Sequence, residues 1–225
     1  MKLYFSPLAC SIATRIALYE AGAPVELIEV DGKTKTSEDG SNFLQVHPLG
    51  LVPVLVTDGG ETITESSAIL QFVASQFPEA RLAPSAGLAR ARLQSWLSFV
   101  ATELHKATYV PLLDEKAPEA AKSYALAHAD TRLDWLASQL DGREFLLDEF
   151  SVADAYLFAV LNWSVVTPID LARWPALSAY MARVQQRPSV KRALDEEKLL
   201  YIRELSRQRA RDAAEPRETG AQAAQ

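Results

Sequence analysis

The only cysteine in this 225-residue sequence, Cys10, lies at the junction between a strand-like segment, residues 2–5, and a segment with helical periodicity. Ile12, Ile16 and Tyr19 recur at the spacing of one helix face, so Cys10 falls at or just before a helix N-terminus. Free amide groups and the helix dipole stabilise a thiolate there, which predicts a lowered thiol pKa and a reactive sulfur. A lone cysteine is also often a small, inert core residue, and position alone leaves both interpretations open.

Two other segments have the chemistry to bind an extended, amino-acid-like ligand. Pro53 opens a predicted strand, and the backbone groups of its neighbour Val52 are available to pair with an extended peptide. Glu65 precedes Ser66 at a predicted helix start, where amide groups bind a carboxylate, a hydroxyl adds a donor and the acid receives an ammonium group. Taken singly, a plain strand-start proline and a routine N-cap are the commoner interpretations.

The elements that must position these groups change character along the chain. Up to about residue 80, strand and helix patterns follow the order β-α-β, an irregular stretch, then β-β-α, which predicts a four-stranded mixed sheet with helices on its faces. Beyond a proline-containing break at residues 78–84, the strand patterns stop. The expected strands lie at residues 2–5, 25–30, 53–56 and 61–64, and the expected helices at 11–21, 66–77, 88–113, 119–140, 151–161, 175–186 and 188–200.

The clearest helix start is the S-x-x-D capping box formed by Ser151 and Asp154, with Phe150 before it. At the other end of the chain, from about Ser206, large apolar residues are almost absent, so we expect a frayed or disordered tail. The predicted organisation is an α/β domain over residues 1–80, an all-helical domain over residues 85–203 and a tail over residues 206–225.

Composition excludes several classes of function. Hydrophobic residues make up 48% and charged residues 23% of the chain, as in ordinary soluble globular proteins. The formal net charge of -6 argues against nucleic-acid binding, and no apolar run is long enough to span a bilayer. One cysteine allows neither an internal disulfide nor a cysteine-based zinc site. We see no metal cluster, and His47 and His128 look incidental. The start of the chain lacks a signal peptide's apolar core, so we expect a cytoplasmic protein.

The motifs occur in a specific order and spacing. The N-terminal run MKLYFSPLACS is followed by Val52-Pro53, by Glu65-Ser66 and by the segment ELHK at residues 103–106. In this combination the sequence resembles the bacterial beta-class glutathione transferases, and the box that starts at Ser151 is similar to a helix-capping segment of the wider family. The resemblance covers roughly residues 1–200. It implies a thioredoxin-like N-terminal domain and an all-helical C-terminal domain.

The resemblance also implies a role for each matching residue. Cys10 matches a cysteine that faces the glutathione sulfur and can form a mixed disulfide with it, and His105 matches a histidine that reaches towards the same sulfur from the helical domain. The residues that the resemblance assigns to glutathione binding are Glu65 and Ser66 at the γ-glutamyl group, Val52 with Pro53 at the cysteinyl part, Lys35 near the glycine carboxylate and Glu103 as a further contact.

The sequence departs from the family pattern at Phe5, where the family usually has a tyrosine. Without that hydroxyl, the expected catalytic residues are Cys10, Ser11 and His105. The remaining departures, which predict a looser or more apolar glutathione pocket, are Ser98 in place of a common asparagine and Leu49 and Leu51 around Gly50.

The implied reaction is attack of a glutathione thiolate on a small hydrophobic electrophile, a detoxification chemistry with glutathione as co-substrate and no cofactor. Thiol transfer or peroxide reduction through Cys10 is a further possibility. The expected electrophile pocket is lined by Leu8, Tyr109, Val110 and Trp163. The family is dimeric, which implies a two-fold homodimer.

Two alternatives remain open. One is a glutathione-dependent thiol oxidoreductase centred on Cys10, and the other is a non-catalytic glutathione-binding module, which Phe5 favours.

Overall fold

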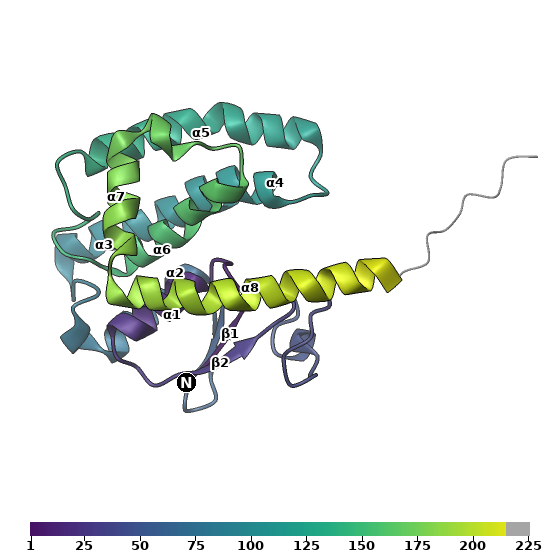
Figure 1. Cartoon of the computed structure of the whole chain (residues 1–225). Helices are drawn as coiled ribbons and strands as arrows, with labels where there is room; N and C mark the ends of the chain where they lie inside the picture. The colour runs from purple at the N-terminus through teal and green to yellow at the C-terminus, as the bar shows by residue number, and fades with distance from the viewer. Residues whose placement is uncertain (215–225) are drawn as a thin grey trace, which may run out of the picture.

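A computed structural model describes residues 1–214 and shows a sheet domain followed by a helical domain (Figure 1). The strand order is β2-β1-β3-β4; β1 and β2 are parallel, whereas β3 is antiparallel to both β1 and β4. The predicted four-stranded mixed sheet is therefore confirmed. Its elements are β1 (Lys2–Phe5), α1 (Ile12–Glu20), β2 (Glu26–Glu29), η1 (Phe43–Gln45), β3 (Val54–Val56), β4 (Thr62–Thr64) and α2 (Ser66–Gln76).

Side chains along β1 alternate between the two faces of the sheet, and α1 covers the buried face. Leu3 and Phe5 are buried on one face of the sheet, and Lys2 and Tyr4 point to the other. Helix α1 covers the core face and contacts α2, α6 and α8. The β1–α1 loop, which carries Cys10, is therefore enclosed by both domains.

The helical domain consists of helices and short helical turns, and the described residues beyond β4 form no further strand. The long helix expected over residues 88–113 is present as three consecutive segments, the middle one a π-helix. The elements are η2 (Pro78–Ala80), α3 (Gly87–Phe99), η3 (Val100–Tyr109), α4 (Val110–Leu113), α5 (Glu119–Leu140), α6 (Val152–Leu161), η4 (Asn162–Val166), η5 (Leu171–Arg173), α7 (Pro175–Gln185) and α8 (Pro188–Ala214).

Helix α6 forms the centre of the helical domain, and every one of its residues is buried. The predicted capping box is confirmed: the Ser151 hydroxyl accepts from the Ala153 amide, and the Asp154 carboxylate accepts from the Ser151 amide at 2.9 Å. Asp154 also accepts from the Leu146 amide at 2.9 Å and the Tyr180 hydroxyl at 3.1 Å. These bonds satisfy donors at a helix start that has no access to water.

Helix α8 is longer than expected. The expected helix ends at residue 200 and a frayed tail begins at 206, but α8 continues to Ala214. Arg207 pairs with Glu29 and Arg211 with Asp31, so the apolar-poor end is held by ion pairs to the sheet domain. In Figure 1, α8 runs along the boundary between the two domains and continues past β1 and β2. Residues 215–225, which the tail prediction also covers, lie outside the described residues.

Across the described residues, no helix combines the length and the apolar character needed to cross a bilayer.

Candidate active site

Ser11 closes the β1–α1 loop. Its hydroxyl donates to the Ser6 carbonyl at 3.1 Å and accepts from the Ser6 amide at 3.3 Å, so it is bonded twice to the backbone at the start of the loop. The side chain is fully buried. The structure thus places Ser11 beneath the loop as a brace, one residue after Cys10.

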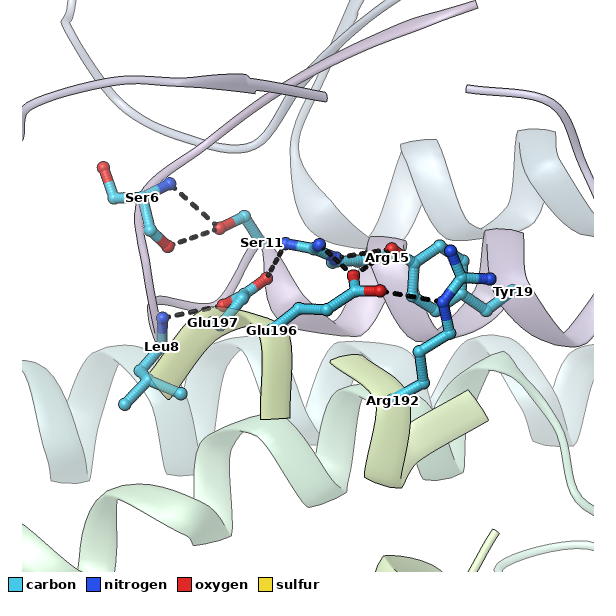
Figure 2. Close-up of polar contacts among 8 residues, drawn as sticks. All are labelled: Ser6, Leu8, Ser11, Arg15, Tyr19, Arg192, Glu196 and Glu197. Atoms are coloured by element: carbon cyan, nitrogen blue, oxygen red, sulfur yellow. Dashed lines mark hydrogen bonds and ion pairs between the residues drawn. The ribbon is translucent and has the colours of Figure 1, made fainter. Parts of the chain in front are cut away.

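Leu8 is held from the helical domain. It has a positive φ of 57°, which a leucine adopts only when its surroundings enforce it. Its amide donates to Oε2 of Glu197 in α8 at 2.7 Å, and its carbonyl accepts from Nε1 of Trp163 in η4 at 2.9 Å. Figure 2 shows the Glu197 carboxylate reaching the loop beside Arg15, whose guanidinium also pairs with Glu196. Two helical-domain side chains therefore determine the backbone path just before Cys10.

The Cys10 thiol faces the turn before β3. Its Sγ donates to the Val52 carbonyl at 3.3 Å. Burial raises the pKa of the thiol to about 11, and the Ser66 hydroxyl and the Lys106 ammonium offset only part of that increase. The expected lowered pKa is thus wrong for this structure. The first helical residue of α1 is Ile12, and desolvation of the thiol outweighs the nearby amides. Cys10 is a neutral thiol at physiological pH.

Val52 and Lys35 meet in the same corner. The Val52-Pro53 peptide bond is cis, and the Val52 carbonyl points to the Cys10 thiol. The Lys35 ammonium donates to the carbonyl of Gly50, two residues before Val52, at 3.0 Å. One edge of the sheet domain therefore carries the Cys10 thiol, the Val52 backbone and the Lys35 ammonium. The resemblance assigns these groups to the sulfur, the cysteinyl part and the glycine carboxylate of glutathione.

The start of α2 contributes Ser66. The helix begins at Ser66, as expected, and Glu65 is its N-cap residue, with a φ of 69° and an exposed side chain. Ser66 is buried, and its hydroxyl lowers the pKa of both the Cys10 thiol and the Tyr156 phenol. Ser66 therefore lies against both groups and links the sheet domain to α6.

His105 reaches the site from η3. Its Nδ1 lies 2.7 Å from the Tyr156 hydroxyl, and its ring centroid lies 5.0 Å from that of Trp163. Burial, with the nearby Lys106 ammonium, lowers the pKa of His105 to about 4. The ring is therefore neutral at physiological pH. Burial also raises the pKa of Tyr156, which stays a phenol able to donate to Nδ1. The Nε2 hydrogen is then available for an acceptor in the site.

The π-helical form of η3 explains why His105 is buried. The Val110 amide donates to the His105 carbonyl, five residues earlier, and the Thr108 hydroxyl donates to the Glu103 carbonyl at 2.8 Å. The wider turn brings the adjacent residues Leu104 and His105 onto the buried side together.

Glu103 points elsewhere. Its Oε2 accepts from Nε of Arg132 in α5 at 2.8 Å, so its described ion pair lies within the helical domain, away from the residues around Cys10. Phe5 is a core residue, with the Arg15 guanidinium 5.1 Å from its ring centroid. As expected from the sequence, no hydroxyl is available at that position.

Two family models match this chain, one in each domain. Residues 1–75 match the family model described as Glutathione S-transferase, N-terminal domain, and residues 86–183 match Glutathione S-transferase, C-terminal domain. Glutathione S-transferase GstA of Escherichia coli O157:H7 is 37% identical over 201 residues, which span 88% of this chain and all of that protein. The chain belongs to the glutathione S-transferase family.

Several solved structures of bacterial members of this family are similar to this chain. The ternary complex of BphK, a bacterial GST, is 46% identical with a TM-score of 0.86, over 88% of this chain and all of that one. The beta-class enzyme of Sphingomonas chungbukensis is 46% identical with a TM-score of 0.84, over 88% of this chain and 98% of that one. A sphingomonad glutathione S-transferase complexed with glutathione is 45% identical, with a TM-score of 0.85 and the same 88% of this chain covered.

Two residues of the candidate site in this glutathione S-transferase were not predicted from the sequence. Tyr156 carries a hydroxyl on a helix whose other central residues are apolar, a signal that could have singled it out. Glu197 has no local signal, because its partners Leu8 and Arg15 lie more than 180 residues earlier in the chain.

Among the described residues of this transferase, no three His, Cys, Asp or Glu side chains gather in a way that could hold a metal ion.

Proposed function

We propose that this chain conjugates the glutathione thiolate to small electrophiles. One observation carries the proposal: the Cys10 thiol, the Val52 backbone and the Lys35 ammonium lie together at one corner. Tyr156, which holds the His105 ring, lies near Cys10 and Ser66. The sphingomonad glutathione S-transferase whose structure is complexed with glutathione is 45% identical to this chain over 88% of its length.

Glutathione would bind in extended form across this corner. The backbone of Val52 would pair with the cysteinyl part, Glu65 and Ser66 would receive the γ-glutamyl ammonium and carboxylate, and Lys35 would pair with the glycine carboxylate. Glu103 is proposed as a contact only if its pair with Arg132 opens.

The bound glutathione thiol would lose its proton to solvent, and the neutral His105 ring would donate its Nε2 hydrogen to the resulting thiolate. Cys10, still protonated, would add an S–H donor once glutathione displaces its bond to Val52. The thiolate then forms a carbon–sulfur bond as the electrophile's leaving group departs with its electron pair. Ser11 acts as a positioning residue through the loop.

The electrophile would bind beside Leu8, Trp163, Val110 and Tyr109, the residues that the sequence predicts as the lining of its pocket. Tyr109 is fully buried, and its hydroxyl has no hydrogen-bond partner within the described part of the chain. Burial raises its pKa, so it stays a neutral donor.

We further propose that the enzyme is a cytoplasmic homodimer that uses glutathione as co-substrate and needs no cofactor.

A specific observation favours thiol transfer through Cys10 as a second candidate: its sulfur lies against the backbone that would hold the cysteinyl part of glutathione. The raised pKa of Cys10 opposes it, because the thiolate is the nucleophile in disulfide exchange.

Calorimetric titration with reduced glutathione, followed by conjugation to 1-chloro-2,4-dinitrobenzene, tests the proposal. We expect micromolar to millimolar binding, chloride release and conjugation that persists in Cys10→Ala. Loss of glutathione-dependent disulfide reduction with retained conjugation in that variant would place a redox role on Cys10. Binding without either activity in the wild type would favour the non-catalytic module, and absence of binding would reject the assignment.

A further inference from the structure

The end of α8 contacts the segment that carries Lys35. We call residues 204–211 the strap. The guanidinium of Arg207 pairs with Glu29 of β2, and Nη1 of Arg211 lies 2.6 Å from Oδ2 of Asp31, just after β2. The strap lies beyond residue 183, where the C-terminal family model ends. Relatives that are matched over their whole length cover 88% of this chain.

Asp31 organises the turn before Lys35. Its Oδ1 accepts from the Lys33 amide at 2.9 Å and from the Thr34 amide at 3.0 Å, while Oδ2 takes the Arg211 guanidinium. Its carbonyl accepts from the Lys35 amide at 2.9 Å. One residue therefore connects the strap to the backbone of the lysine assigned to the glycine carboxylate.

Lys35 itself is in a constrained conformation. Its φ is 57°, and its carbonyl accepts from the Phe43 amide at 2.9 Å. Its ammonium reaches the Gly50 carbonyl, beside Val52. A lysine prefers negative φ, so the surrounding turn must hold it in this position. Loosening the turn at Asp31 would let the ammonium leave the glutathione corner.

Charge explains why the strap needs its arginines. Glu29 and Glu204 are 8% and 7% exposed, and Glu204 lies close to both Glu29 and Asp31. Burial, with Asp31 and Glu29 nearby, raises the pKa of Glu204. Burial would likewise raise the pKa of Asp31, but Arg211 and the Thr34 and Lys33 amides outweigh it and lower that pKa. Arg207 and Arg211 thus neutralise an acidic cluster that would otherwise repel itself.

We infer that the strap positions Lys35 for the glycine carboxylate of glutathione, an inference that rests on the proposed function. The strap acts through Asp31 and the turn, so it determines affinity for the glycine end of the ligand. It leaves the sulfur chemistry around Cys10 and His105 unchanged.

The test compares two ligands in one double variant, Arg207→Ala with Arg211→Ala. The Kd for glutathione should rise about fivefold, the equivalent of about 1 kcal/mol. The Kd for γ-glutamylcysteine, which lacks the glycine, should change by less than about twofold, and kcat should stay unchanged. Arg209→Ala is the matched control, an exposed arginine between the two.

The outcomes separate the inference from the proposed function. If the wild type binds neither ligand, the proposed function fails and the inference falls with it. If the wild type binds glutathione and the double variant binds it equally well, only the strap inference fails. Equal weakening of both ligands also overturns it, because that indicates general damage to the domain.

Two further measurements do not depend on turnover. The double variant should show faster amide hydrogen exchange at Lys33 and Thr34, whose amides bond to Asp31. The charge-swapped pair Glu29→Arg with Arg207→Glu should recover glutathione affinity relative to Arg207→Glu alone. Unchanged exchange, or no recovery in the swap, would contradict a strap that works through these ion pairs.

Discussion

Asp154 and Glu197 are both fully buried carboxylates, and they stabilise the molecule in different ways. Asp154 accepts hydrogen bonds from the Ser151 and Leu146 amides and from the hydroxyls of Ser151 and Tyr180. Glu197 accepts one amide hydrogen, from Leu8, and pairs with Arg15. Burial raises the pKa of both carboxyls, that of Glu197 to about 7.

The difference is one of distance along the chain. Asp154 bonds mainly to residues within eight positions and fixes the start of one helix, whereas Glu197 joins α8 to a loop 189 residues away. The first device stabilises the fold of the helical domain. The second joins α8 to the loop that carries Cys10 by a hydrogen bond.

The largest effect is expected from Asp154→Ala. It leaves buried amide and hydroxyl donors without a partner and removes half of the capping box. We expect a loss of about 4 kcal/mol in the free energy of unfolding, measured by denaturant titration. Ser151→Ala, which removes only one capping hydroxyl, should cost about 1 kcal/mol. Equal losses of unfolding free energy in the two variants would show that the Asp154 carboxylate contributes no more than the Ser151 hydroxyl.

Glu197→Ala should cost less, about 3 kcal/mol, because Arg15 keeps its pair with Glu196. Unlike Asp154→Ala, it should also lower the glutathione conjugation rate in protein that remains folded, since Leu8 loses its anchor. Steady-state kinetics at a temperature well below both unfolding transitions checks this. A folded Glu197→Ala protein with full activity would contradict the claim that Glu197 affects catalysis through Leu8.

The pH dependence distinguishes the ionised and neutral forms of Glu197. Its folded pKa of about 7 exceeds the ordinary glutamate value of 4.5, so the folded state binds a proton more tightly than the unfolded chain does. Its contribution is therefore most favourable below pH 4.5 and is lost as pH rises towards 7. Between pH 4.5 and 7 the free energy of unfolding of the wild type should fall by roughly 1–3 kcal/mol relative to that of Glu197→Gln. Arg15 and Glu196 face the carboxyl and are present in both proteins, so a flat difference would contradict the raised pKa.

The smallest effect is expected from Trp163→Phe, which removes the indole donor to the Leu8 carbonyl and keeps most of the ring. We expect a loss of about 1 kcal/mol in stability and a small decrease in activity. Addition of Trp163→Phe to Glu197→Ala should cost less than the sum of the two, since both act on Leu8. Strict additivity would show that the two anchors work independently.

Local patterns were sufficient for most of the fold. The strands, the capping box at Ser151 and the break after α2 could be predicted because hydrophobic periodicity and turn chemistry act over a few residues. The protonation state of Cys10 could not, because burial by distant elements overrides its place near a helix start. Neither could the π-helical turn at His105 or the last part of α8, which is held by partners in β2 and the loop after it.

The π-helical segment η3 also bears on how this site could diverge. A π turn accommodates one residue more than an α turn over the same rise, so deletion of a single residue within Val100–Tyr109 can be absorbed by return to α geometry. Such a deletion would rotate His105 relative to Leu104 without breaking the helix. Length variation of one residue here is thus a route by which relatives could gain or lose an imidazole at the sulfur while keeping the same scaffold.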